Sequence, residues 1–414
     1  MHATRREFMR LGLGTSTLLA CGASVPAFLA RSARVLAAEP KKNKDRILVV
    51  VQLDGGNDGL NTVVPYRDPE YIKHRPRLHL PEKGLHKIDD RVALHPSLAD
   101  FGKLLQKRQL AIVQSVGYPN PNRSHFESMA IWQTARLEPL ADTPGWLART
   151  LDRQPLTPGS DSAGLHISDT ALPQALLGSQ RHVPSLASLE QFRRRLGIAE
   201  GKAANAQRAA LDHISAATQA EPGSLLDFVE RSTLITYASS ARLENIGQAA
   251  TGDYPFFTLA QRLKLIAQLI KAGLTTSIYY TQLGGFDTHA DQLNAHGFLL
   301  RELSESLQAF LNDMSKSGEG KRIIVLVFSE FGRRLKENGS AGTDHGTAAP
   351  VFVIGEPVQG GLHGPYPNLQ DLQDGDPKHA VDFRSIYATV LERWLGCGST
   401  AVLGERFRHL PLLA

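Results

Sequence analysis

Seven side chains of the kinds that bind metal ions or attack esters lie in loops next to apolar segments of the chain. They are Asp54, Ser124, Asp287, His289, Glu330, Asp344 and His345. Carboxylates mixed with imidazoles suit zinc, manganese or another divalent ion, whereas a purely carboxylate site favours magnesium or calcium. Two ions about 4 Å apart can together bind one substrate oxyanion and activate a nucleophile. These residue types therefore predict a metal site that could hydrolyse an ester.

The first candidate, Asp54, follows an uninterrupted apolar stretch. The run from Ile47 to Val51 has no helical spacing and is rich in β-branched residues, so it predicts a buried strand. Gly55 and Gly56 then allow the backbone to turn sharply and to approach a ligand. Ligands bind outside the carboxyl ends of strands in open α/β sheets, which makes Asp54 a candidate site residue. A turn in which Asp54 or Asn57 only caps a backbone amide is the alternative.

Arg123 and Ser124 follow a second predicted strand, residues 110–116, and a loop rich in proline and asparagine. A helix is expected to begin here, and unpaired amides at a helix N-terminus favour anions and lower the cost of ionising a hydroxyl. Ser124 would act as a nucleophile once a metal or a base removes its proton. Arg123 or Arg333 could bind a phosphate or sulfate group through two parallel hydrogen bonds. A helix-capping role for Ser124 is the alternative.

The remaining candidates border three further predicted strands, at residues 276–282, 322–328 and 350–354. Asp287 and His289 follow the first of these strands, and Glu330 follows the second. Asp344 and His345 precede the third. Each residue alone has an ordinary explanation, such as a local hydrogen bond, a helix cap or a surface ion pair. Their shared position at strand ends is what a ligand site in an α/β sheet requires.

Strands alternate with helices along much of the chain. Helices are expected at residues 124–134, 260–274, 292–315 and 382–395. This alternation predicts an α/β fold with a doubly wound, mostly parallel sheet that is covered by helices on both faces. Residues 137–255 are expected to form a largely helical insertion or cap, because residues 203–250 are rich in Ala, Gln and Ser. Residues 399–414 are expected to form a C-terminal tail.

Length and charge narrow the class of protein. A chain of 414 residues suits one large α/β domain or two average ones. Five arginines and one glutamate within residues 1–38 account for +4 of the formal net charge of +5. The rest of the chain is therefore almost neutral, which gives no electrostatic case for a nucleic-acid partner.

The basic N-terminal segment has the pattern of an export signal. Arg5 and Arg6 precede a weakly hydrophobic run from Leu11 to Ala30. Residues 1–38 resemble a twin-arginine signal peptide, which implies export of a folded protein by the twin-arginine translocase to the periplasm or the exterior. Glycines and a proline interrupt the run, so a transmembrane helix is not expected. Cys21 lies in a lipoprotein-like box and could carry a lipid anchor.

Longer motifs resemble one exported bacterial family. They are LDGGNDGLNTVVPY, LHPSL, PNPNRSHFESMAIWQTA, GGFDTHADQ, FSEFGRRLKENGSAGTDHG and VDFRSIYATVLERWLG. In this order they resemble the domain-of-unknown-function family 1501 across residues 45–398. That family is similar to a branch of the alkaline phosphatase and sulfatase superfamily, whose fold is a doubly wound α/β sheet with a two-metal site.

The resemblance implies roles for the candidate residues. Asp54 matches a metal-binding aspartate after the first strand, and Ser124 is placed like the superfamily nucleophile. Asp287 and His289 resemble an Asp–His pair on one ion. His345 resembles the last histidine ligand.

Two departures from the superfamily pattern limit what the resemblance implies. Glu330 leaves a strand where the superfamily usually has Asp-His, and Phe331 follows it instead of a histidine. The usual second metal site therefore lacks one ligand. The sulfatase maturation motif Cys-x-Pro-x-Arg does not surround Ser124. A sulfatase that works through formylglycine is accordingly disfavoured.

The residues and the resemblance together predict an exported hydrolase that uses divalent zinc, manganese or magnesium ions. Its expected substrates are phosphate esters, and less favourably sulfate esters, of a small molecule or a polysaccharide. The ions would polarise the ester oxygens, and Ser124 would attack. A catalytically inactive, metal-stabilised binding or scaffold protein of the cell envelope is the alternative, and Phe331 is the residue that favours it.

Overall fold

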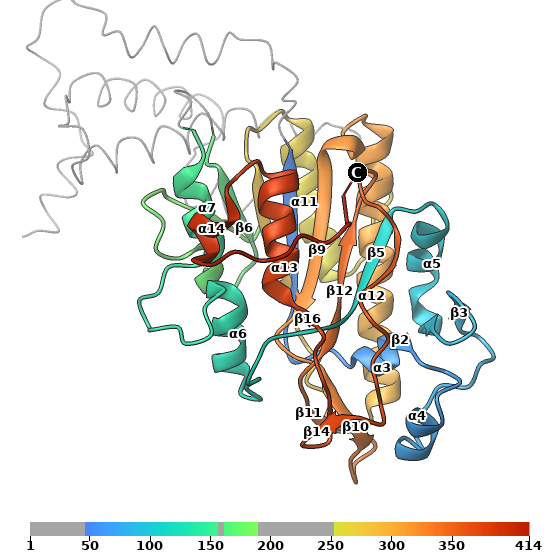
Figure 1. Ribbon diagram of the computed structural model, residues 1–414. Coiled ribbons are helices and arrows are strands. Elements are labelled where there is room, and N and C mark those ends of the chain that lie inside the picture. The colour runs from blue at the N-terminus through green and yellow to red at the C-terminus, as the bar shows by residue number, and fades with distance from the viewer. Residues whose placement is uncertain (1–45, 156–160, 189–251, 414) are drawn as a thin grey trace, which may run out of the picture.

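The computed structural model describes residues 46–155, 161–188 and 252–413. Its centre is a nine-stranded sheet with the strand order β13-β5-β12-β9-β1-β8-β6-β7, and β16 pairs with β5 (Figure 1). The bounds are β1 Ile47–Leu53, β5 Leu110–Gly117, β6 Gly164–Ile167, β7 Ser185–Leu186, β8 Ile278–Leu283, β9 Ile323–Ser329, β12 Ala349–Ile354, β13 Gly361–His363 and β16 Val381–Asp382. In this sheet β12 pairs antiparallel with both neighbours and the other pairings are parallel. The predicted α/β class with a mostly parallel sheet is confirmed.

The strand β1 lies between β8 and β9 and is buried along its whole length. Its side chains alternate between the two faces of the sheet, as the pleat of a strand requires. Val49 and Val51 join one hydrophobic core, and Leu48 and Val50 join the other. A continuous apolar run is thus used on both faces, which is why this strand shows no alternation in the sequence.

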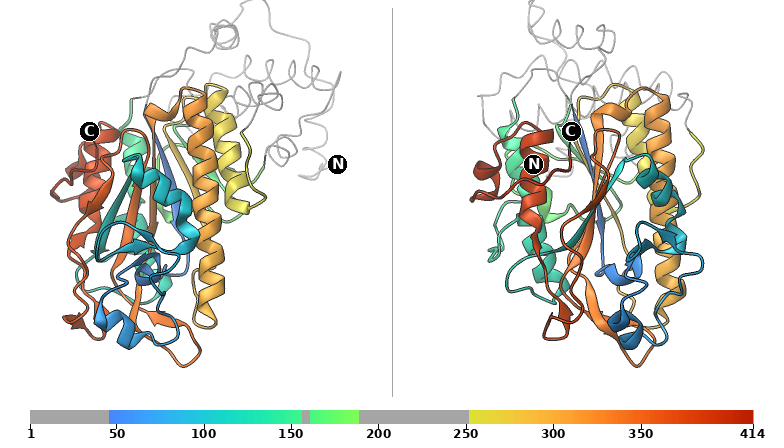
Figure 2. Two further views of the ribbon diagram at one scale, coloured as in Figure 1. Left: turned by 90° about the vertical axis from the view of Figure 1, so that its right-hand side faces the viewer. Right: turned by 45° about the vertical axis from the view of Figure 1, so that its right-hand side comes forward.

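Helices cover both faces of the sheet (Figure 2). One face packs against α5 Ala99–Gln106, α11 Thr258–Lys271 and α12 Gln292–Lys316. The other face packs against α6 His125–Thr134, α7 Trp146–Arg153, α13 Phe383–Thr389 and α14 Ser399–Leu403. A π-helical turn, Val390–Trp394, continues α13. This arrangement confirms the prediction of a sheet covered on both faces.

Short elements complete the fold. They are α3 Gly59–Thr62, α4 Pro69–His74, β2 Val63–Val64, β3 His86–Lys87, β4 Ala93–Leu94, β10 Arg333–Glu337, β11 Thr343–His345, β14 Leu372–Gln373, β15 Asp376–Pro377 and the 3₁₀ turns Pro96–Leu98, Gln174–Leu176 and Gly320–Arg322. The hairpin of β10 and β11 connects β9 to β12. Because this connection contains a hairpin and no crossover helix, β12 begins at the edge of the sheet where β9 ends and runs antiparallel to it.

The described part of residues 137–255 differs from the expected helical insertion. Residues 161–188 supply β6 and β7 to the edge of the main sheet, next to β8. The strand β6 reads GLHI, too short and too mixed to be recognised from its apolar pattern. The helices expected at residues 203–250 and the signal at residues 1–38 lie outside the described residues.

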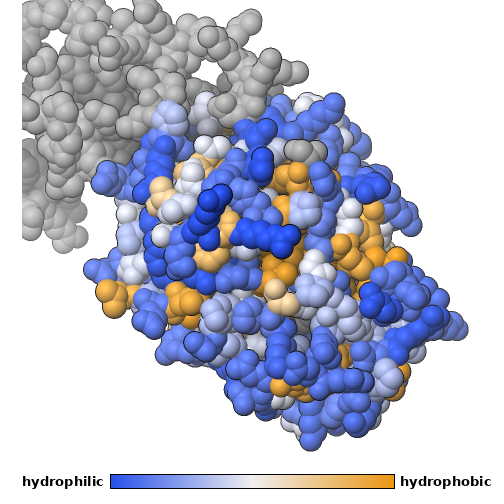
Figure 3. Space-filling model, viewed as in Figure 1, coloured by the Kyte–Doolittle hydropathy of each residue, from blue (hydrophilic) through white to orange (hydrophobic). Residues whose placement is uncertain are grey.

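The C-terminal segment contributes to the core. Leu403 and Leu412 are buried, and Val358 forms a bridge with Leu413. The expected tail is therefore packed against the domain through its described residues. On the face in Figure 3, hydrophilic residues predominate and apolar residues form small groups. None of the helices described combines the length and the apolar composition needed to cross a bilayer.

Candidate metal centre and active site

The candidate residues converge at one edge of the main sheet. The strands β1, β5, β8 and β9 run in the same direction, so the loops after them leave from the same edge. Because β12 is antiparallel, the segment before it, with His345, begins at this edge too. The direction of β12 explains how a residue that precedes a strand joins residues that follow strands.

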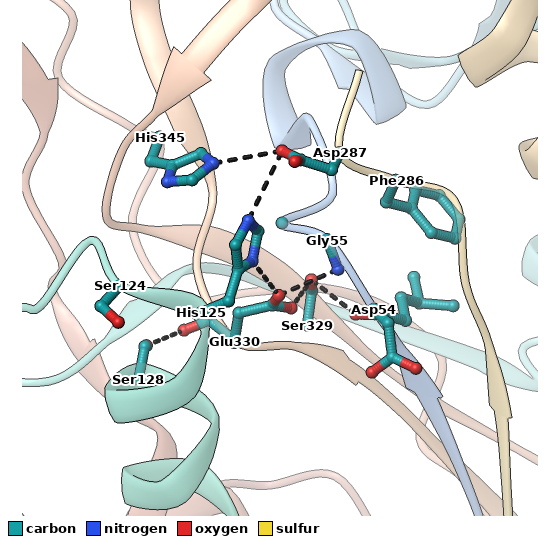
Figure 4. Close-up of polar contacts among 12 residues, drawn as sticks. Asp54, Gly55, Ser124, His125, Ser128, Phe286, Asp287, Ser329, Glu330 and His345 are labelled. Carbon is teal, nitrogen blue, oxygen red and sulfur yellow. Dashed lines mark hydrogen bonds and ion pairs between the residues drawn. The ribbon is translucent and has the colours of Figure 1, made fainter. Parts of the chain in front are cut away.

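Four side chains form a compact group, here named the His–Asp cluster: His125, Asp287, His289 and His345. Ligand atoms of His125, Asp287 and His345 all lie within 4.8 Å of one another. Asp287 Oδ1 is 3.5 Å from His125 Nε2, 3.1 Å from His289 Nε2 and 3.1 Å from His345 Nε2. The Nε2 atoms of His289 and His345 are 2.9 Å apart. Figure 4 shows His125 and His345 directed at Asp287.

The other ring nitrogen of each histidine faces a hydrogen-bond acceptor. His125 Nδ1 is 2.8 Å from Glu330 Oε1, and His345 Nδ1 is 2.8 Å from the Arg123 carbonyl. His289 Nδ1 is 3.4 Å from Asp344 Oδ1. With Nδ1 protonated and donating, each Nε2 would be free to direct a lone pair at a bound cation beside Asp287. Metal-binding histidines are held in the same way, with the nitrogen away from the ion donating to a carboxylate or carbonyl.

The His–Asp cluster fits a divalent cation. Tetrahedral bonds of about 2.0 Å place ligand atoms about 3.3 Å apart. The distances from Asp287 Oδ1 to the three histidines, 3.1 to 3.5 Å, and the 2.9 Å between His289 and His345 are close to this value. A divalent cation among these atoms would accept a lone pair from each imidazole and offset the charge of Asp287. Three imidazoles and one carboxylate suit zinc or manganese better than calcium.

Glu330 supports the cluster from a buried position. Its side chain is 2% exposed, and Oε1 accepts from the backbone N–H of Gly55 at 2.9 Å as well as from His125. Ser329 Oγ donates to Oε2 at 2.8 Å. The hydrogen bond from His125 to Glu330 raises the pKa of that imidazole. In this arrangement Glu330 orients His125, whereas the sequence predicted it to be a direct ligand.

Arg333 ties the loops of the site together. Its guanidinium is fully buried and donates to Asp287 Oδ1 at 2.7 Å, and also to the carbonyls of Gly56 at 2.7 Å and Thr343 at 2.8 Å. Burial alone would raise the pKa of Asp287, but hydrogen bonds from Arg333 and His345 outweigh it and lower that pKa to about 2. Arg333 is thus committed to the protein, so the predicted phosphate-binding role has no free guanidinium here.

Asp54 lies in a cleft beside the cluster rather than within it. The cleft has a volume of about 490 Å³, and Asp54, Asp287 and Glu330 contribute to its lining. Burial raises the pKa of Asp54 to about 6, although the hydrogen bond from Gln52 opposes this shift. Gln52 also accepts from Gln133 at 2.7 Å. Asp54 is therefore a positioned carboxylate that can hold or release a proton near neutral pH.

Ser124 immediately precedes α6, and its backbone amide donates to Asn122 Oδ1 at 2.7 Å. Its side chain makes no capping hydrogen bond and is not part of the cleft lining. Figure 4 shows that the next residue, His125, points to Asp287, whereas Ser124 points elsewhere. Arg123 pairs with buried Asp376 at 2.5 Å. The catalytic roles of Ser124 and Arg123 stay predictions.

Phe331 fills the place next to the cluster. It is 1% exposed, and its ring centroid is 5.0 Å from that of His125 and 4.8 Å from that of His345. A Cβ on Gly56 would lie 2.3 Å from the Phe331 ring, and Gly56 has a φ of +74°. The turn after β1 therefore requires glycine at position 56. The Phe331 ring occupies the space beside the cluster that a further polar ligand would need.

Sequence reasoning missed His125 as a member of the cluster. The signal was present, because His125 is next to Ser124 at the start of a helix that follows a strand. The choice between adjacent residues depends on which way each side chain leaves the helix start. Asp344 is also displaced from its predicted role, because it contacts the outer nitrogen of His289 instead of the centre of the cluster.

A buried polar network lies behind the loops. Asp58 and Arg75 form a fully buried ion pair at 2.6 Å, and Gln292 donates to the same carboxylate. Gln292 Oε1 accepts from the hydroxyls of Thr288 at 3.2 Å and Thr343 at 2.6 Å. Gln292 thus connects the loop of Asp287 and His289 with the hairpin of His345.

Comparison with known proteins identifies the family. Residues 45–398 match the family described as "Protein of unknown function (DUF1501)", so the chain belongs to this family, as its motifs predict. No curated protein matches the chain.

Similar solved structures include the PsFucS1 sulfatase from Pseudoalteromonas sp., at 12% identity, 94% coverage of this chain, 76% of that chain and a TM-score of 0.41. A protein in the alkaline phosphatase superfamily from Vibrio parahaemolyticus has 8% identity, coverages of 94% and 78% and a TM-score of 0.39. The phosphonate monoester hydrolase SpPMH from Silicibacter pomeroyi has 10% identity, coverages of 89% and 76% and a TM-score of 0.36.

Proposed function

We propose that this protein is an exported, metal-dependent hydrolase of phosphate esters, with sulfate esters as less favoured substrates. The observation that carries the proposal is the His–Asp cluster, in which three histidines turn one nitrogen each to Asp287 and the other to an acceptor. Preference for phosphate over sulfate rests on the motif resemblance and on the missing maturation motif around Ser124.

The side chains of the His–Asp cluster would hold one divalent ion, zinc, manganese or magnesium. When bound, the ion supplies a Lewis acid for the ester oxygens. Asp54 takes a proton from the attacking group in the cleft, since its raised pKa makes it a base near neutral pH. Gln52 fixes the orientation of Asp54, and Glu330 fixes that of His125.

The attacking group is either water or the Ser124 hydroxyl. The described geometry favours water deprotonated by Asp54, because Asp54 lines the cleft and Ser124 does not. Ser124→Ala and Asp54→Asn separate the two routes. Full turnover by Ser124→Ala together with a loss of about 100-fold or more in Asp54→Asn supports water. The reverse pattern assigns the attack to Ser124.

Elemental analysis of the purified protein tests the metal proposal. We expect about one equivalent of a divalent transition metal in the parent, and less in Asp287→Ala. A panel of phosphate and sulfate monoesters, assayed with and without chelator, then tests turnover. Absence of metal after incubation with zinc and manganese would overturn the proposal.

Export is part of the proposal and rests on Arg5, Arg6 and the weakly hydrophobic run after them. Replacement of both arginines by lysine keeps the charge and removes the twin-arginine signal. We expect the parent in the periplasm or the medium and the double variant in the cytoplasm. Labelling with a radioactive fatty acid tests the lipid anchor at Cys21.

A second candidate function is a metal-stabilised binding or scaffold protein of the cell envelope. The position of Phe331, packed on His125 and His345, favours it because a second ion would lack space for its ligand there. This candidate predicts bound metal without turnover on any ester. Reproducible metal-dependent turnover by pure protein would exclude it.

A further inference from the structure

Helix α6 presents an apolar stripe to the cleft. Phe126, Met129, Ala130 and Gln133 all line the cleft, and they follow one another at the i, i+3, i+4 and i+7 positions of a single helix face. Another face of the same helix packs Trp132 into the core. On the cleft face, Phe126 is exposed, Met129 packs partly against the core and Gln133 is buried.

Phe126 is the most exposed part of this stripe, with 89% of its surface accessible. It directly follows His125 in the chain, and both residues line the cleft together with Asp287. At the far end of the stripe, Gln133 donates to Gln52, which in turn donates to Asp54. The stripe therefore runs along the cleft between the ion site and the proposed base.

The charges of the cleft restrict what can lie on this stripe. Asp54, Asp287 and Glu330 bring carboxylates, and the described residues that line the cleft include no lysine or arginine. The arginines nearest to the site already donate to carboxylates: Arg123 to Asp376, Arg262 to Asp169 and Arg333 to Asp287. In the part of the cleft that lies away from the ion, these carboxylates would repel a group that carries several negative charges.

We infer that the cleft binds the alcohol part of its ester as an uncharged ring with a flat apolar face, which stacks on Phe126 and contacts Met129. The ring can be aromatic or a sugar, because both present such a face. The polar edge of the ring meets the amides of Gln133 and Gln174, which also line the cleft. This inference rests on the proposed ester hydrolysis and adds the class of leaving group.

Binding of the free ring tests the inference without any turnover. Saturation-transfer NMR on the parent protein, metal-free and zinc-loaded, uses phenol in one sample and methyl glucoside in another. We expect a signal from at least one ring, and the responding probe distinguishes an aromatic from a sugar. Phe126→Ala should lose the signal. The matched control Phe256→Ala removes another fully exposed phenylalanine outside the cleft and should keep it.

Kinetics give the second readout. We expect Phe126→Ala to lower kcat/KM for phenyl phosphate about tenfold and to leave methyl phosphate unchanged, since only the first ester has a ring to stack. Absence of ring binding in the parent, or equal binding in Phe126→Ala, overturns the inference even if methyl phosphate is hydrolysed. Ring binding that needs Phe126, without turnover of any ester, overturns the proposed hydrolysis and supports the inferred ring site.

Discussion

Replacement of Glu330 by glutamine should weaken metal binding without disturbing the fold. Glu330 Oε1 accepts from His125 Nδ1 at 2.8 Å, and the side chain is 2% exposed, so water screens the interaction little. Glutamine keeps a carbonyl oxygen for His125 and for the N–H of Gly55 but removes the charge. Its NH2 group replaces the oxygen that accepts from Ser329 Oγ, and that hydroxyl can donate to the Leu53 carbonyl instead. Removal of a carboxylate that accepts a hydrogen bond from a metal-bound histidine typically lowers the affinity for the metal about 10- to 100-fold. This corresponds to about 1.4 to 2.7 kcal/mol of binding free energy.

Asp344→Asn is the matched control for this prediction. Asp344 Oδ1 lies 3.4 Å from His289 Nδ1, and the Asp344 side chain is 55% exposed, so the interaction is that of a surface pair. We expect Asp344→Asn to lower the affinity for zinc about threefold or less. The assay is competition for zinc between metal-free protein and a chromogenic chelator, with circular dichroism to verify folding. Unchanged affinity in a folded Glu330→Gln protein, or equal losses in both variants, would refute the role of His125 as a ligand.

Three further predictions concern stability and are measured by urea unfolding. Leu326→Ala should cost about 2–5 kcal/mol, because this side chain is fully buried in the central sheet; a smaller loss would mean that the core closes around the cavity. Arg75→Met should cost about 3–5 kcal/mol, because it leaves Asp58 buried without its partner; unchanged stability would show that the pair contributes nothing. Burial lowers the pKa of His95 to about 4 and that of His296 to about 3. As the pH falls from 7.5 to 5.5, the unfolded chain takes up protons at these two histidines and the folded protein does not. The two histidines together should therefore lower the free energy of unfolding by about 3 kcal/mol over this range. Equal urea midpoints at pH 7.5 and pH 5.5 would contradict this prediction.

The main strands were predictable because their apolar runs leave little choice. The segments at β1, β5, β8 and β9 are rich in β-branched residues and long enough to span a sheet. The strands β6 and β7 were not predicted, because four and two residues carry no usable period. The antiparallel direction of β12 depends on the β10–β11 hairpin, a pairing between residues that no local pattern reveals.

The site was predictable to the level of loops but not of side chains. Asp287, His289 and His345 meet because their loops share one edge of the sheet. The direction in which a side chain leaves its loop is set by tertiary contacts, such as those of Arg333 with four backbone carbonyls around the site. For that reason His125 enters the cluster beside Ser124, and Asp54 lies at the side of it.

The members of the His–Asp cluster come from three segments of the chain, around residues 125, 287–289 and 345. Only the finished sheet brings these segments together, so an unfolded chain contains no such cluster, and an ion held there binds the native state alone. Each tenfold excess of free ion over its dissociation constant then adds about 1.4 kcal/mol to the free energy of unfolding. Metal supply and folding would then be thermodynamically linked, and a compartment that chelates the ion would also remove part of the stability of the protein.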